Sequence, residues 1–220
     1  MSNSLSDKKW RTLLRSAWLF RLVPFVEFVL VAGSMATGEP REDSDFDVII
    51  GVRKGRIFTA RLGCYAIFAP LGLWARHPGR TENKFCFNHF VTPASYRLSP
   101  PHNTYWQFLY RSLVPIYGDP KAVQTFFDAN AGWLNERRTF VPDARYSGAR
   151  AYGVVRMKEW ALSGWYGDLM ERFFKKVQLS HMARATSPRD TYEPRLVISD
   201  AELEFHPHTK RIKEYIEKVL

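Results

Sequence analysis

Cysteine is scarce in this 220-residue chain, which has only Cys64 and Cys86. Both stand among apolar residues, so we expect buried, reduced thiols. No CxxC pair is present and the six histidines are scattered, so the sequence does not support a structural zinc site. The GxxxxGK[ST], GxSxG and HExxH motifs are also absent, so the sequence gives no support for a P-loop NTPase, an α/β-hydrolase or a zincin.

Long apolar runs are lacking as well. The longest apolar tract, residues 57–75, is interrupted by Arg61 and Pro70 and is barely long enough to cross a bilayer. We therefore interpret it as a buried helix. The first nine residues are not followed by an uninterrupted apolar segment with a small-residue cleavage site, which argues against a secretory signal. We expect a cytoplasmic protein that does not enter a membrane.

Acidic residues are fewer than basic ones, 22 against 32, and the net charge is +10. The basic excess is uneven, because residues 51–100 contain eight Lys or Arg and only one acid, Glu82. Such a surface attracts the phosphates of a nucleotide or a nucleic acid, although a solvated basic face explains the charge equally well. The length suits one sizeable domain, or a compact domain with a helical appendage.

Hydrophobic periodicity predicts the order of the secondary-structure elements. The expected elements are a helix over residues 8–22, strands over 25–32 and 46–52, a helix over 57–74, a strand over 84–92, helices over 103–113, 121–134 and 148–185 (one helix or two), a short extended segment over 195–199, and a basic amphipathic helix over 209–220. Asp119 is expected to cap the helix over 121–134.

This order predicts an α/β (α+β) fold, in which helices flank a small mixed β-sheet. We expect residues 1–135 to form the main domain, with its core at about residues 20–100. Residues 136–220 are expected to form a helical C-terminal region packed on that domain.

Residues 29–52, VLVAGSMATGEPREDSDFDVIIGV, hold the pattern with the most chemical content. A buried strand ends at Gly33-Ser34, ten residues separate Ser34 from Asp45, and a second apolar strand opens with Asp45 and Asp47. Strand side chains alternate, so both carboxylates project from one face. Two close carboxylates repel each other unless a cation such as Mg²⁺ lies between them. Gly33 would let the backbone approach a phosphate, and Ser34 would offer it a hydroxyl and an N–H group.

Weaker candidates lie elsewhere in the chain. Arg53, Lys54 and Arg56 follow the second strand and could meet phosphates, or could form a solvated turn. His206 and His208 flank a proline without an evident third ligand, and we interpret them as loop or packing residues. Three alternating acids near the C-terminus are interpreted as a solvated strand or helix start: Asp200, Glu202 and Glu204.

The segment GSMATGEPREDSDFDV resembles the signature of the DNA polymerase β-like nucleotidyltransferase superfamily, in which a Gly-Ser turn precedes Asp-x-Asp on the next strand. Three further stretches are similar to one branch of uncharacterised predicted nucleotidyltransferases of bacteria and archaea: NKFCFNHFVT, residues 104–130, and residues 199–207.

The resemblance implies a role for each residue of the motif. Gly33 and Ser34 would hold a nucleoside triphosphate, and Asp45 and Asp47 would bind Mg²⁺ that bridges its phosphates. An acceptor hydroxyl would attack the α-phosphate, so that a nucleoside monophosphate is transferred and pyrophosphate is released. Two metal ions would stabilise the attacking and leaving oxygens.

The chain departs from the superfamily at the third carboxylate, which usually lies on the next core strand. Here that strand is KFCFNHFVT, and its best-placed polar residue is Asn88. Asn88 could bind a metal through its carbonyl oxygen but cannot act as a general base. His89 could accept a proton, but strand alternation predicts that it faces the other way. Glu82 lies in the loop before the strand. The missing carboxylate leaves three alternatives. Another acid from elsewhere in the chain completes the site, only one metal ion binds well, or the protein binds nucleotide without turning it over.

The sequence therefore leads to a Mg²⁺-dependent nucleotidyltransferase that moves a nucleoside monophosphate from an NTP to an unknown hydroxyl on a protein, a small molecule or RNA. The alternative is a catalytically degenerate protein of the same fold that binds nucleotide or nucleic acid. A third hypothesis gives residues 148–185 a role in protein interaction, as the surface of a homodimer or of another complex.

Overall fold

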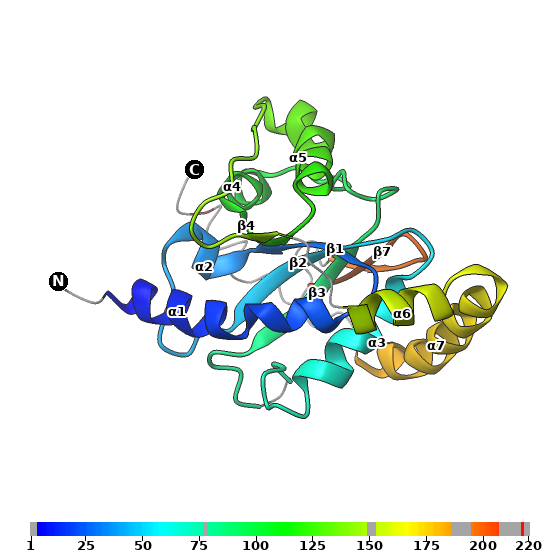
Figure 1. The fold of residues 1–220 in the computed structure, drawn as a ribbon. Coiled ribbons are helices and arrows are strands. Elements are labelled where there is room, and N and C mark those ends of the chain that lie inside the picture. The colour runs from blue at the N-terminus through cyan, green and yellow to red at the C-terminus, as the bar shows by residue number, and fades with distance from the viewer. Residues whose placement is uncertain (1–3, 77–78, 149–152, 186–194, 207–216, 218–220) are drawn as a thin grey trace.

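The computed structural model describes residues 4–76, 79–148, 153–185, 195–206 and 217. It confirms a mixed α/β fold. Within the described residues, a seven-stranded mixed sheet has the order β5-β4-β1-β2-β3-β7-β6, with helices on both faces (Figure 1). The predicted helix over 209–220 and the connection at 186–194 lie outside the described residues, except for residue 217.

Three central strands carry the motif and its neighbours: β1 (Val26–Val31), β2 (Phe46–Val52) and β3 (Phe85–Val91). β1 runs antiparallel to β2, and β2 runs parallel to β3. The outer strands are β4 (Val114–Gly118), β5 (Ser147–Gly148), β6 (Arg195–Ile198) and β7 (Glu202–His206). β7 pairs antiparallel with β3 and with β6, and β5 pairs parallel with β4, so the region 136–220, predicted to be helical, also adds three strands to the sheet.

The helices are α1 (Leu5–Ala17), the 3-10 helix η1 (Trp18–Leu22), α2 (Gly33–Thr37), α3 (Ile57–Phe68), α4 (Thr104–Ser112), α5 (Pro120–Leu134), α6 (Gly153–Ala161) and α7 (Gly164–Ala185). Ser4 and Asp7 form a capping box that starts α1 three residues before the predicted helix. The side chain of Asp119 accepts a hydrogen bond from the backbone N–H of Lys121, which confirms the predicted cap of α5. The helix predicted over 57–74 ends at Phe68.

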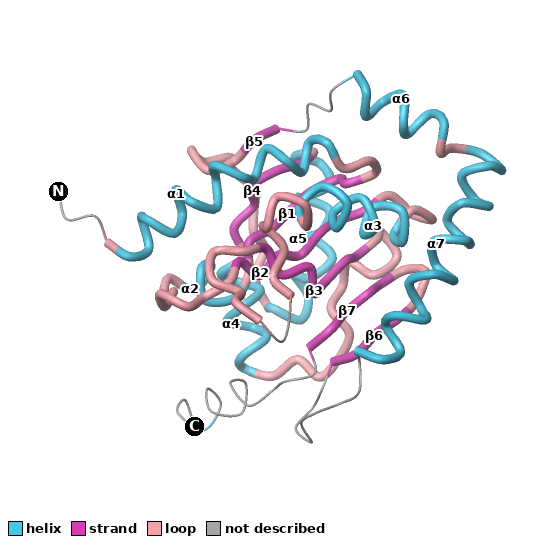
Figure 2. Tube along the Cα trace, turned by 90° about the horizontal axis from the view of Figure 1, so that it is seen from below, coloured by secondary structure: helices cyan, strands magenta, loops and turns pink. Residues whose placement is uncertain are grey.

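The two faces of the sheet bury separate apolar clusters. One face lies under α1, α3 and α7, as the view from below shows (Figure 2), and we call it the α3 face. Its cluster includes Phe46, Val48, Phe87 and Phe90. The opposite face lies under α4 and α5, and we call it the α4 face. Ile49 is among the residues of its cluster, together with side chains of the two helices. Burial of this apolar surface is the main force that stabilises the fold.

Polar contacts fix α7 on α3. The Glu171 carboxylate of α7 accepts hydrogen bonds from the backbone N–H groups of Phe58 and Thr59 at 2.8 and 2.9 Å, and from the Thr59 hydroxyl. These amides belong to the first turn of α3, where no intrahelical acceptor exists. Arg56 adds an ion pair with Asp168 of α7 at 2.7 Å. One acidic side chain of α7 therefore serves as the missing cap of α3.

The outer surface of α6 and α7 carries many large apolar side chains. Trp160 and Trp165 are 81% and 79% exposed. Others on the same two helices are exposed to a lesser degree: Val154, Met157, Tyr166, Leu169, Phe173 and Val177. Exposed apolar patches of this kind mark interaction surfaces on soluble proteins. In the part of the chain that the structure describes, no helix has both the length and the apolar character needed to span a membrane.

We expect Glu171→Ala to destabilise the protein by about 1–2 kcal/mol, because loss of a cap leaves two amides without an acceptor. The measurement is the free energy of unfolding in urea. Arg172→Ala, at an exposed position next to Glu171 on α7, is the matched control and should change stability by less than about 0.5 kcal/mol. Equal effects of the two substitutions would show that the cap contributes nothing.

Candidate metal–nucleotide site

The two carboxylates of the motif lie close together at one end of the central strands. Asp45 precedes β2 and Asp47 is its second residue, and both are partly buried. Single ligand atoms of Asp45, Asp47 and Cys86 all lie within 4.8 Å of one another. Cys86 takes part because the parallel register pairs it with Asp47. The structure thus brings the two predicted metal ligands together, and it adds a thiol that the sequence did not single out.

Gly33 is in direct contact with Asp47. Its φ angle is +60°, in the left-handed region that favours glycine. A Cβ atom built on Gly33 would lie 2.2 Å from the Asp47 Oδ2 atom, so any other residue would collide with the carboxylate. The Asp47 carbonyl also accepts a hydrogen bond from the Ala32 N–H group at 2.9 Å. Glycine at this position is what lets the β1–α2 turn close on the carboxylate.

Ser34 and Lys9 hold the loop that leads to Asp45. The Ser34 hydroxyl lies 3.2 Å from the Ser44 hydroxyl, one residue before Asp45. Lys9 of α1 is almost fully buried, and its ammonium donates to the carbonyls of Glu42 and Ser44 and to the side chain of Asn83 at 2.8–3.0 Å. Burial lowers the pKa of Lys9, and the surrounding acids partly offset that shift. No sequence pattern marked Lys9, which looks like one more charge on a surface helix.

Asn88 lies beside Asp47, on the strand where the resemblance implies a third carboxylate. Its amide nitrogen donates to the Asp47 Oδ1 atom at 3.1 Å. This hydrogen bond orients the Asp47 carboxylate, and in it the Asn88 side chain acts as a donor. Burial and the charges of Asp47 and Asp45 raise the pKa of the Cys86 thiol well above its usual value, and the thiol is hydrogen-bonded to Asp45. Cys86 therefore stays protonated near neutral pH and offers no general base.

The expectation that His89 faces away from Asn88 was wrong. The register shifts between the pairs Asp47–Cys86 and Ile49–His89, so β3 contains one extra residue there. This irregularity breaks the strict alternation of side chains. Phe87 and Phe90 accordingly share the cluster on the α3 face, although alternation would separate them. Asn88 reaches Asp47, and His89 also turns to the α4 face, where its ring lies beside the ring of His206.

Arg53 and Lys54 are not brought to the carboxylates. They follow the last residue of β2, whereas Asp45 and Asp47 stand at its start, and a seven-residue strand separates the two places by about 20 Å. Arg53 instead forms an ion pair with Glu159 of α6 at 3.2 Å and packs on Phe25. These contacts hold α6 against the sheet. Lys54 is exposed in the turn before α3.

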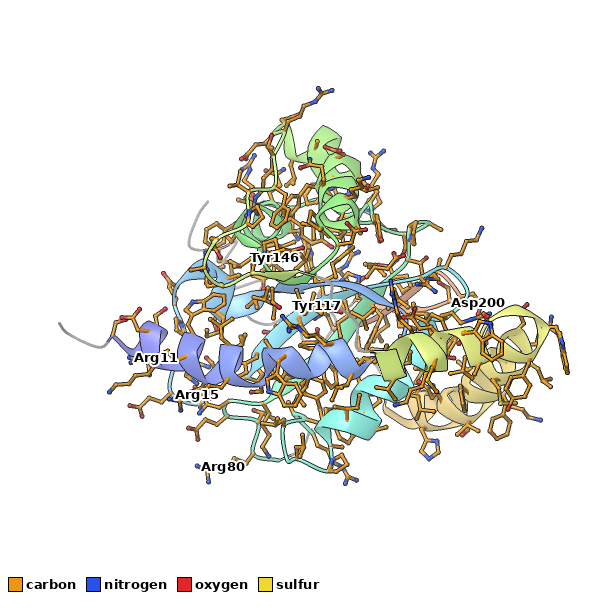
Figure 3. All side chains as sticks on the ribbon, in the orientation of Figure 1. Arg11, Arg15, Arg80, Tyr117, Tyr146 and Asp200 are labelled. Atoms are coloured by element: carbon orange, nitrogen blue, oxygen red, sulfur yellow. The ribbon has the colours of Figure 1, made fainter. Side chains whose placement is uncertain are left out.

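The interpretation of the three alternating acids as solvated was wrong for two of them. Glu202 and Glu204 lie on β7 and are 5% and 0% exposed, because β7 is paired with β3 on one side and with β6 on the other, and Trp106 of α4 packs beside His206 of this strand. Burial disfavours the ionised form of Glu204, but His89, His206 and Arg195 outweigh it and lower the pKa of this carboxyl. Asp200 is exposed, in the β6–β7 turn, and pairs with Lys175 of α7 (Figure 3). His208 lies outside the described residues.

The donor set at the start of β2 fits a hard divalent cation. Two carboxylates supply oxygen ligands at a separation that one ion can bridge, and Mg²⁺ binds in this way together with substrate phosphates. A cysteine sulfur is a soft donor and suits such a hard ion poorly. The same two carboxylates would be the ligands of Mg²⁺, with Asn88 holding one of them in place.

Comparison with known proteins finds no matching family model, no similar curated protein and no similar solved structure. The chemistry of this site is therefore argued from its residues.

We expect Gly33→Ala to displace the Asp47 carboxylate, since the added Cβ would overlap it, and to weaken divalent-cation binding at least tenfold. Left-handed strain alone costs about 1–2 kcal/mol. Gly38→Ala is the matched control, because Gly38 has φ +84° but a Cβ added there would have no neighbouring atom within 4 Å. Isothermal titration calorimetry with Mn²⁺ measures the cation affinity, and unfolding in urea measures the free energy of unfolding. Equal behaviour of both variants would contradict the contact described here.

Proposed function

We propose that this protein binds a nucleoside triphosphate with Mg²⁺ at Asp45 and Asp47 and transfers the nucleoside monophosphate to a hydroxyl acceptor. The observation that carries the proposal is the packing of Gly33 against the Asp47 carboxylate, with Asp45 beside it. A glycine turn that closes on two ligand carboxylates leaves backbone, and no side chain, next to the place where phosphates would lie. The resemblance of the motif to the polymerase β-like nucleotidyltransferases supports the same chemistry.

The residues of the site have separate tasks under this proposal. Asp45 and Asp47 bind the cation, and Asn88 keeps the Asp47 carboxylate oriented. Ser34 would donate its hydroxyl to a phosphate oxygen, in place of its contact with Ser44. Bound Mg²⁺ would supply positive charge to the phosphates and to the leaving oxygen.

Exposed basic side chains lie on α1 and on the connection before β3. Arg11 and Arg15 project from α1 into solvent, and Arg80 projects from the connection before β3 (Figure 3). Lys9, on the same helix as the first two, contacts the loop that leads to Asp45. Arg80 is paired with Glu82 at 3.1 Å, so acids of the same region offset part of this positive charge. The net charge of +10 for the whole chain, rather than the position of these side chains, supports a phosphate-bearing substrate.

A second function, nucleotide binding without turnover, is favoured by one observation. Asn88 donates its amide to Asp47 and cannot accept a proton from an acceptor hydroxyl. A site with two carboxylates and no base would hold one metal and a nucleotide. Binding with no release of pyrophosphate from any of the four NTPs would favour this function over transfer.

We expect Asp47→Asn to lower Mg²⁺-dependent release of pyrophosphate from NTP by about 100-fold or more, since an amide replaces a charged metal ligand. Asp43→Asn is the matched control, because Asp43 is exposed in the same loop and pairs with Arg41 in a surface ion pair. The assay follows transfer from α-labelled NTPs with and without Mg²⁺. Full activity of Asp47→Asn, alongside an unaffected control, would refute the assignment.

A homodimer remains a proposal, and the exposed apolar surface of α6 and α7 supports it. Aromatic side chains bury roughly 150–250 Å² each. The eight exposed residues of this surface therefore approach the roughly 800 Å² per partner of a standard interface. An interface on these helices would leave the site at the start of β2 open.

We expect the protein to sediment as a dimer at micromolar concentration, and Trp160→Glu with Trp165→Glu to convert it to a monomer, since two charges would be buried in the contact. Trp18→Glu is the control, because Trp18 is an exposed tryptophan on η1 that is not one of the eight exposed residues of α6 and α7. Analytical ultracentrifugation gives the mass. A monomeric native chain across the accessible concentrations would rule out the dimer.

A further inference from the structure

A second polar cluster lies on the α4 face where β3 pairs with β7, with His89 and Glu204 buried and His206 partly exposed. The antiparallel register places His89 directly opposite Glu204, and His206 lies two residues further along β7 on the same face. One ligand atom each of His89, Glu204 and His206 lies within 4.8 Å of the others. The rings of the two histidines meet edge to face, with centroids 6.3 Å apart. Two imidazoles and a carboxylate are thus held together by backbone pairing.

Glu204 has an unsatisfied oxygen inside this cluster. Its side chain is fully buried, and Oε1 accepts a hydrogen bond from Arg195 Nε at 2.8 Å. Oε2 is buried and has no hydrogen-bond partner among the described residues. His206 Nε2 is 3.7 Å from Oε1, too far for a hydrogen bond. A buried carboxylate oxygen without a partner is costly, and a bound cation would remove that cost.

The surroundings of the cluster match those of metal-binding histidines. His89 Nε2 lies 3.0 Å from Glu202 Oε1, so Glu202 can fix the ring through one nitrogen and leave the other with a lone pair. Arg195 holds Glu204 from the other side and is itself anchored by the Ser99 carbonyl at 2.9 Å. Metal-ligating histidines and carboxylates are commonly supported by such outer hydrogen bonds.

We propose that His89, Glu204 and His206 form a transition-metal site that takes Zn²⁺ and is separate from the site at Asp45 and Asp47. Two imidazoles with one carboxylate form a donor set that suits zinc, whereas Mg²⁺ prefers an all-oxygen set. Zinc bonds of about 2.0–2.1 Å place tetrahedral ligand atoms roughly 3.3 Å apart, so the three side chains close in slightly when the ion binds. The site does not depend on the proposed transfer reaction.

The test is titration of the metal-stripped full-length protein with Zn²⁺, followed by calorimetry and by the metal content after gel filtration. The native chain should bind one tight Zn²⁺, and Co²⁺ in its place should give the visible absorption of a tetrahedral site. His206→Ala should weaken binding by at least tenfold, and Glu202→Gln by about tenfold through loss of support for His89. His181→Ala, which removes an exposed histidine of α7, should leave binding unchanged.

Circular dichroism checks that each variant is folded. If His206→Ala does not fold, Glu202→Gln still tests the proposal, because it keeps all three ligands. Absence of tight Zn²⁺ binding by the native chain would overturn the proposal. So would binding that survives His206→Ala and Glu202→Gln, or binding that Asp47→Asn abolishes and these variants do not. The last result would move the zinc to the other site. None of these readouts uses nucleotide, so failure here leaves the proposed transfer untouched, and the reverse also holds.

Discussion

The contact between Gly33 and the Asp47 carboxylate is the constraint on which the site depends. A side chain at Gly33 would occupy the position of the Asp47 Oδ2 atom, so β1, the turn after it and the start of β2 can meet only through a glycine. The backbone bond from Ala32 to the Asp47 carbonyl closes the same junction. Lys9 then ties the loop before Asp45 to α1. The carboxylate pair is thus fixed by three segments that are distant in sequence.

Local patterns were enough to predict the elements that carry the motif. The predicted limits of β2 are those of the structure, because its seven residues are apolar at every position but one and are bounded by charged residues. The cap at Asp119 and the pairing of Asp45 with Asp47 also follow from neighbours in sequence. The mixed α/β class followed from the order of these elements.

Features that depend on pairing between distant segments were not predictable in this way. Periodicity alone gave no reason to expect the extra residue in β3, yet that residue turns His89 to the α4 face. Glu202 and Glu204 alternate as solvated residues do, and only their position between β3 and β6 buries them. A lysine on a surface helix is expected to be exposed, so the burial of Lys9 was likewise not predictable from its sequence context. In each case the register of the sheet, set by strands far apart in the chain, decides the environment of a polar side chain.

The most direct test of the metal–nucleotide site is a crystal structure of the protein with a non-hydrolysable NTP and Mn²⁺, which replaces Mg²⁺ and scatters anomalously. The account predicts an anomalous peak bridging Asp45 and Asp47, with the triphosphate against the backbone of Gly33. A triphosphate bound elsewhere, or Mn²⁺ that leaves these two carboxylates empty, would contradict it.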